Sequence, residues 1–158
     1  MSGQYSHDPR KHREIIEQVI SYADLLDEYE KNCVMSGDYE SEREDSWEYK
    51  RLLDYLVSLN IDQFNAVYCA YELGGSGEGY FPPVIVDAET EADYDEEVSC
   101  YHSIGEWIDW VVGDFAECRE KEKYGIEDPR TPERLAGFVN LSACLKRAMN
   151  YLFGYKNP

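Results

Sequence analysis

Apolar residues between positions 15 and 33 recur every three or four positions, which is the period of an α-helix. Asp8 suits the N-cap of this helix and Pro9 its first position, because the first turn has N–H groups without partners in the helix. A stripe of this length needs a covering apolar surface, so the segment predicts a packed helix. The stripe consists of Ile15, Ile16, Val19, Ile20, Ala23, Leu26, Tyr29 and Cys33.

Similar stripes predict further helices over 45–60, 62–73, 103–125 and 131–154. Asp45, Asp62, Ser103 and Thr131 are the expected caps, and Gly74 is the expected end of the third helix. Val98, Tyr101 and Ile104 suggest a helical turn or two before the fourth helix. The same spacing assigns Trp47, Val57, Trp107, Trp110 and Val139 to buried faces.

The chain of 158 residues is long enough for one hydrophobic core. We therefore predict an all-α fold, with residues 1–158 forming a single compact, acidic domain of five or six helices. At most one short strand is expected, near 84–86. Residues 1–7 are expected to be mobile, and 36–45 and 74–97 to be rich in loops, since glycine and proline interrupt the second of these ranges.

The cysteines predict a reducing compartment. They are odd in number and contain no C-x-x-C pair, so a complete disulfide framework is not expected. The polar N-terminus lacks a signal sequence, and no apolar run has the length of a membrane span. A cytoplasmic protein is expected, in a bacterial host cell if a phage encodes it. The cysteines are Cys33, Cys69, Cys100, Cys118 and Cys144.

Charge is the main indicator of function. Asp and Glu number 33 against 15 Lys and Arg, giving a formal net charge of −18, and no base occurs between Arg51 and Arg119. Direct nucleic-acid binding needs a basic face, and binding to an anionic membrane is disfavoured for the same reason. The last helix carries Lys146, Arg147 and Lys156, and the sequence leaves open whether they pair with the acidic segments.

The predicted partner-binding site is an acidic run in the long loop. Alternate residues of an extended chain share one face at a spacing of roughly 6.6 Å, so this run would form an anionic row. Such a row can imitate the phosphates of nucleic acid, although a solvated acidic loop is the alternative. The predicted site consists of Asp87, Glu89, Glu91, Asp93, Tyr94, Asp95, Glu96 and Glu97.

No catalytic, metal or cofactor site is predicted. An EF-hand loop starting at Asp87 would have Ala92 and Val98 where glycine and glutamate are required. The glycine-rich segment 74–79 lacks the lysine of a phosphate-binding loop. Cys100 and His102 are too close in sequence for a typical catalytic pair, so the protein is predicted not to be an enzyme.

An acidic surface rich in tyrosine suits an arginine-rich groove, because carboxylates pair with guanidinium groups and rings stack on them. We expect a protein that binds a basic nucleic-acid-binding protein or nuclease complex and blocks its nucleic-acid site. In size and charge, without any shared motif, the chain is similar to the small acidic DNA-mimic proteins that phages use against host defence, including anti-restriction and anti-CRISPR inhibitors. An immunity protein or antitoxin against a basic toxin is one alternative. A small metal-binding protein or enzyme is another, and the oligomeric state stays open.

Overall fold

The computed structural model describes residues 5–36, 43–75, 84–85, 100–101, 103–122 and 130–154, and the side chains of 34–36, 84–85, 100 and 118–122 are not described. The fold is all-α, as the sequence predicts. Its helices are α1 (Arg13–Ser36), α2 (Trp47–Ser58), α3 (Ile61–Leu73), α4 (Ile104–Glu122), α5 (Pro132–Ala136) and α6 (Leu141–Met149). Short helical turns cover Pro9–Lys11, Arg43–Asp45 and Asn150–Gly154, and the strands are β1 (Val84–Ile85) and β2 (Cys100–Tyr101).

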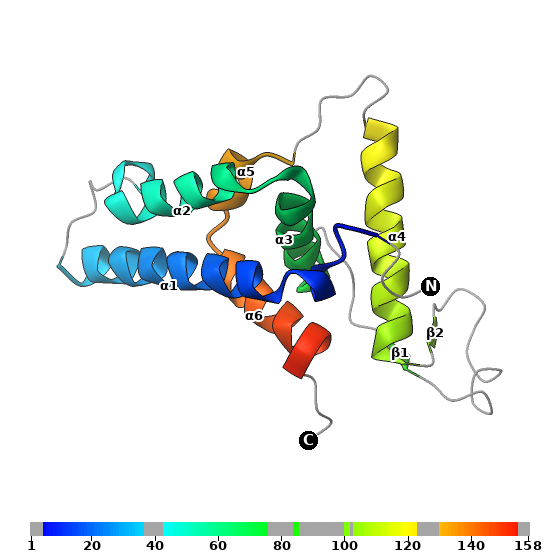
Figure 1. Ribbon diagram of the computed structural model, residues 1–158. Coiled ribbons are helices and arrows are strands. Elements are labelled where there is room, and N and C mark those ends of the chain that lie inside the picture. The colour runs from blue at the N-terminus through cyan, green and yellow to red at the C-terminus, as the bar shows by residue number, and fades with distance from the viewer. Residues whose placement is uncertain are drawn as a thin grey trace.

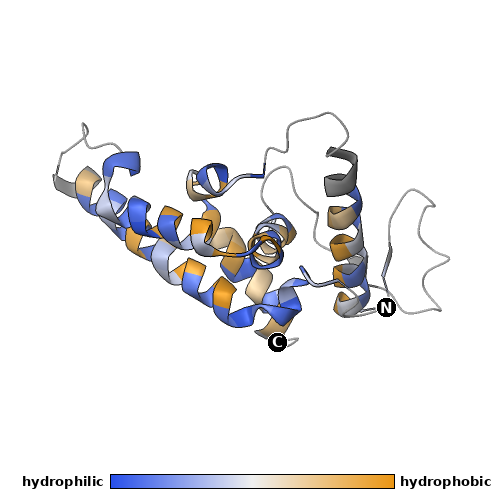
Figure 2. Ribbon diagram, turned by 45° about the horizontal axis from the view of Figure 1, so that its top comes forward, coloured by the Kyte–Doolittle hydropathy of each residue, from blue (hydrophilic) through white to orange (hydrophobic). Residues whose placement is uncertain are grey.

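Helix α3 lies at the centre of this arrangement. Helices α1 and α2 run side by side at one end of the molecule, and α4 stands on the far side of α3 (Figure 1). Figure 2 shows α3 end-on between the α1–α2 pair and α4. Because α3 is covered by α1, α4 and α6, most of its residues are buried, including Phe64, Val67, Tyr68 and Tyr71. An apolar surface on nearly every side is typical of such a central helix.

Three helix starts differ from the predicted ones. Asp8 caps the separate turn Pro9–Lys11, and α1 begins only at Arg13. Ser46, not Asp45, caps α2, and its Oγ accepts a hydrogen bond of 3.1 Å from the N–H of Tyr49. Asn60, not Asp62, caps α3 in a reciprocal capping box with Gln63. A cap must directly precede the first turn, so that its side chain reaches the N–H three residues on. Gly74 ends α3 as predicted.

The last predicted helix is two helices. The N–H of Gly137 turns back to the carbonyls of Glu133 and Arg134 and ends α5, so α6 starts on a new axis at Leu141. Phe138 still packs inward and stacks on Tyr71, with ring centroids 4.8 Å apart. The interruption changes the phase of the stripe, so the prediction that Val139 is buried is wrong, and its side chain is 70% exposed.

Three more aromatic or apolar assignments are corrected. Trp47 is 61%, Val57 58% and Trp110 51% exposed, whereas Trp107 is buried as predicted. The buried face of α2 consists of Tyr49, Leu52 and Leu56, and Trp47 and Val57 lie outside it.

The strands correct a further expectation. β1 lies where one strand is predicted, but Tyr101 belongs to a second strand rather than to a helical turn. The two strands pair in parallel, with Val84 opposite Cys100 and Ile85 opposite Tyr101. A strand needs a partner for its backbone groups, so a single strand was an incomplete prediction.

The cysteines that the structure describes agree with a core role. Cys69 and Cys144 are buried thiols, and Cys33 is a partly buried one. Burial raises the pKa of Cys69 well above its ordinary value and also raises the pKa of Cys144. Such thiols are poor nucleophiles. Over the described residues, no helix combines the length and apolar character needed to span a membrane.

Candidate protein-interaction surface

The predicted partner-binding residues, Asp87, Glu89, Glu91, Asp93, Tyr94, Asp95, Glu96 and Glu97, all lie outside the described residues. The structure does place the two ends of the segment that carries them. Because β1 pairs with β2, the chain leaves at Ile85 and returns at Cys100, beside its point of departure. β2 leads directly into α4, and the ring of Tyr101 lies 6.3 Å from that of Trp110. The acidic segment is therefore attached next to α4.

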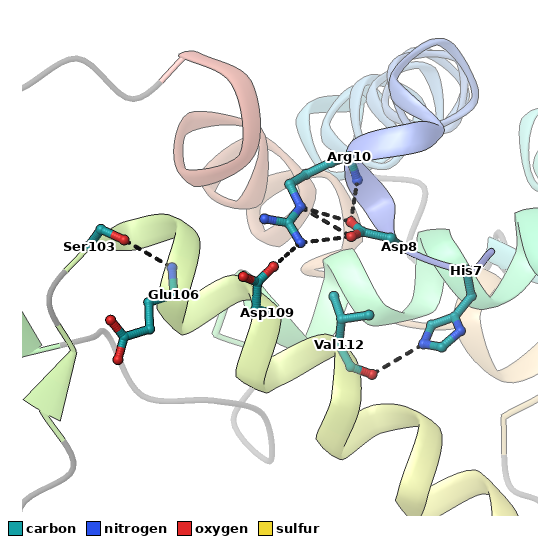
Figure 3. A network of polar contacts seen from close by, with 7 residues as sticks. All are labelled: His7, Asp8, Arg10, Ser103, Glu106, Asp109 and Val112. Atoms are coloured by element: carbon teal, nitrogen blue, oxygen red, sulfur yellow. Dashed lines mark hydrogen bonds and ion pairs between the residues drawn. The ribbon is translucent and has the colours of Figure 1, made fainter. Parts of the chain in front are cut away.

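The outward face of α4 combines carboxylates with an exposed indole. Glu106, Trp110 and Glu117 are four and seven residues apart, so they lie on one side of the helix. Both glutamates are exposed and Trp110 is 51% exposed. Ser103 begins the helix, since its Oγ accepts a hydrogen bond of 3.1 Å from the N–H of Glu106 (Figure 3). The opposite face is buried and consists of Trp107, Ile108, Val111, Val112 and Phe115.

An N-terminal clip, residues 7–10, holds α4 to the rest of the molecule. Arg10 donates hydrogen bonds to both carboxylate oxygens of Asp8 and pairs with Asp109 on α4 (Figure 3). His7 donates from Nε2 to the carbonyl of Val112, with 3.2 Å between the two atoms. His7 and Asp8 are only 9% and 1% exposed. Asp109 is thus part of an ion pair.

The charges of the clip perturb each other. Burial alone would raise the pKa of Asp8, but the hydrogen bonds and positive charge of Arg10 outweigh it and lower that pKa. The hydrogen bond with Asp8 raises the pKa of Arg10, burial opposes it, and Asp109 adds to the rise. The carboxylate of Asp8 thus stays ionised although it is almost completely buried.

This arrangement predicts a pH-dependent cost for Arg10→Leu. At neutral pH the variant leaves the ionised Asp8 without its guanidinium, and we expect a loss of about 2 kcal/mol in unfolding free energy. The lowered pKa of Asp8 contributes stability above the unfolded value of about 3.9, and this is lost as pH falls through the folded pKa. The difference between variant and wild type should therefore shrink in acid. Urea unfolding at several pH values measures it, and a difference independent of pH would contradict it.

Bases from the C-terminal part of the chain pair with acids of other helices. Arg130 pairs with Glu72 at 3.5 Å, and its guanidinium lies 4.6 Å from the ring centroid of Phe115. Lys146 pairs with Asp24 at 3.0 Å, so the last helix does use one of its bases internally. Arg147 donates to the carbonyl of Gly74 instead. Lys156 lies outside the described residues.

The described side chains form no group of metal ligands. Among them, no three His, Cys, Asp or Glu residues gather closely enough to hold a metal ion. The side chain of Cys100, and His102 altogether, lie outside the described residues.

Sequence reasoning missed the clip and the exposure of Trp110. Nothing in the sequence links Arg10 to Asp109, which lies 99 residues away. A signal for Trp110 did exist, because seven residues bring Glu117 back to nearly the same side of the helix. Trp110 shares its face with two glutamates. These polar neighbours predict that Trp110 is exposed, whereas its spacing from Trp107 predicted that it is buried.

Comparison with known proteins adds no relative. No protein-family model matches the sequence, and no curated protein or solved structure matches it significantly. The function therefore has to follow from the charges, exposure and packing of this chain alone.

Proposed function

We propose that this protein binds a basic nucleic-acid-binding protein or nuclease complex and inhibits it by occupying its nucleic-acid site. The observation that carries the proposal is the outward face of α4, with Glu106, Trp110 and Glu117, next to which the acidic segment leaves and returns. Competition is the mechanism: carboxylates take the positions of phosphates, and an exposed ring takes that of a base.

The distribution of charge supports this proposal. The net charge of −18 comes from a chain with no Lys or Arg between Arg51 and Arg119. Arg10 and Arg130 are directed inward, to Asp109 and Glu72, rather than across the outer face of α4. A one-signed surface attracts a basic partner over a distance and speeds its association.

The chemistry of the α4 face suits arginine in particular. The protein binds its own arginines with a carboxylate and a ring together. Arg43 pairs with Glu30 and lies 5.8 Å from the ring centroid of Tyr49, and Arg13 pairs with Glu17 and lies 5.1 Å from that of Phe153. Glu106 and Trp110, one helical turn apart, offer the same combination at the surface.

Charge reversal tests the proposal. One variant reverses four acids of the predicted site, Glu89, Glu91, Asp93 and Asp95, to lysine, and another carries Glu106→Lys and Glu117→Lys. A matched control carries Glu14→Lys and Glu28→Lys, which are exposed acids of α1 and give the same change in charge as the α4 pair. Each immobilised protein is exposed to bacterial lysate and eluted with rising salt, which screens surface charge contacts.

We expect wild type and the control to retain a basic nucleic-acid-binding protein, and the fourfold variant to lose it. The α4 pair should weaken binding by about tenfold or more. The purified partner should release its nucleic acid when the wild-type protein is added in equal amount. A partner that still binds nucleic acid in the complex would refute the proposed mechanism. If the control lost as much binding as the α4 pair, the effect would come from the net charge of the protein and not from the face of α4.

A further inference from the structure

The outward face of α2 carries a pattern that neither the fold nor the proposed function uses. Trp47 and Val57 lie near its two ends and are 61% and 58% exposed. Lys50 and Asp54 lie between them and are also exposed. The spacings are three, four and three residues, which place all four side chains on one stripe of the helix.

The charges at the middle of this stripe are available. In the part of the chain that the structure describes, neither Lys50 nor Asp54 makes an ion pair, although they are one helical turn apart. The indole of Trp47 is held in place, because the guanidinium of Arg51 lies 4.7 Å from its ring centroid and 5.3 Å from that of Tyr22. An exposed aromatic side chain that is already ordered loses little conformational entropy when it is covered.

We propose that this face is a homodimer interface, in which α2 packs antiparallel against α2 of a second copy. In an antiparallel arrangement, the stripe of one copy is complementary to the same stripe of the other copy. An antiparallel pair centred near position 52 brings Trp47 opposite Val57 of the other copy, and Lys50 opposite Asp54. A two-fold axis makes each of these pairings twice. The spacing of three and four residues is that of helices packed at a shallow angle.

Charge complementarity selects a second copy as the occupant. A partner for this stripe needs an acid opposite Lys50, a base opposite Asp54, and apolar groups opposite both ends. The stripe itself supplies that order. A helix of three turns buries less than a standard interface of roughly 1,200–2,000 Å², so the dimer should be weak and form only at high concentration. The inference does not depend on the proposed function, because it uses a different face.

A charge swap tests it. Lys50→Glu places two acids opposite each other at each pairing, and Asp54→Lys places two bases there. The double variant Lys50→Glu with Asp54→Lys restores opposite charges at every pairing. Lys31→Glu is the matched control for Lys50→Glu, because Lys31 is exposed on α1 and both substitutions change the charge by the same amount. Sedimentation equilibrium at about 0.15 M salt, which limits repulsion between the two acidic copies, gives the mass against concentration.

For wild type and for Lys31→Glu we expect the mass to rise from 18.4 kDa towards twice that value as concentration increases. Each single reversal should weaken the dimer by about tenfold or more, and the double variant should recover it. All three mutated positions are exposed, so circular dichroism should show unchanged helicity. A monomer at every accessible concentration would overturn the proposal. So would a dimer that the single reversals leave intact, or one that the double variant fails to recover.

Discussion

Gly74→Ala is expected to lower the unfolding free energy by about 3 kcal/mol or more, which corresponds to a fall of roughly 6–12 °C in Tm for a domain of this size. A Cβ at this position would lie 1.8 Å from the carbonyl oxygen of Cys144. The obstacle is backbone, so no side-chain rotation relieves it. Helices α3 and α6, which pack closely against each other, would have to move apart at this contact.

The cause is steric rather than conformational. The φ of Gly74 is −76°, which any residue adopts. Gly105→Ala is the matched control, because among the described residues the new methyl group would meet only the Ser103 hydroxyl, at 3.7 Å, and it lies in the first turn of α4. It should raise stability by about 0.5–1 kcal/mol. Thermal unfolding of the two variants compares them, and similar losses in both would contradict the close contact between α3 and α6.

Phe115→Ala is expected to cost about 3–5 kcal/mol. The ring is fully buried on the inner face of α4. It supports two polar groups as well, since the guanidinium of Arg130 lies 4.6 Å and the ring of His7 lies 5.5 Å from its centroid. Removing it leaves a cavity and loosens both the clip and the Arg130 contact. Helix α4 should therefore lose its protection from amide hydrogen exchange before α1 and α2 do.

Trp110→Ala provides the comparison on the same helix. Its indole is half exposed, so the loss of stability should stay within about 1 kcal/mol. The same variant should weaken binding to the partner proposed above. A large loss of stability in Trp110→Ala, or a small one in Phe115→Ala, would mean that α4 packs with the opposite face inward.

Local signals in the sequence predicted most of the helices. Four residues of the predicted apolar stripe of α1 are buried, because one side of a helix of this length must be covered. They are Ile16, Val19, Ala23 and Leu26. Thr131 and Pro132 mark the start of α5 as predicted, since a cap depends on only three or four neighbouring residues. The end of α3 at Gly74 is local for the same reason.

The candidate site was harder to predict. The sequence located the acidic segment, but its side chains lie outside the described residues, so its role stays a prediction. The sequence placed Trp110 in the core because two tryptophans three residues apart resemble a buried pair. Only the packing of α4 against α3 decided which of the two faces inward.

The sequence by itself determined the helical class, the excess of acid and the absence of bases from one long stretch. These follow from periodicity and counting, which need no knowledge of distant neighbours. Tertiary structure alone decided that Arg10 reaches Asp109, that Arg130 reaches Glu72 and that Gly74 touches Cys144. Each contact joins residues more than 50 positions apart, and their meeting depends on how whole helices pack. No local pattern encodes that packing.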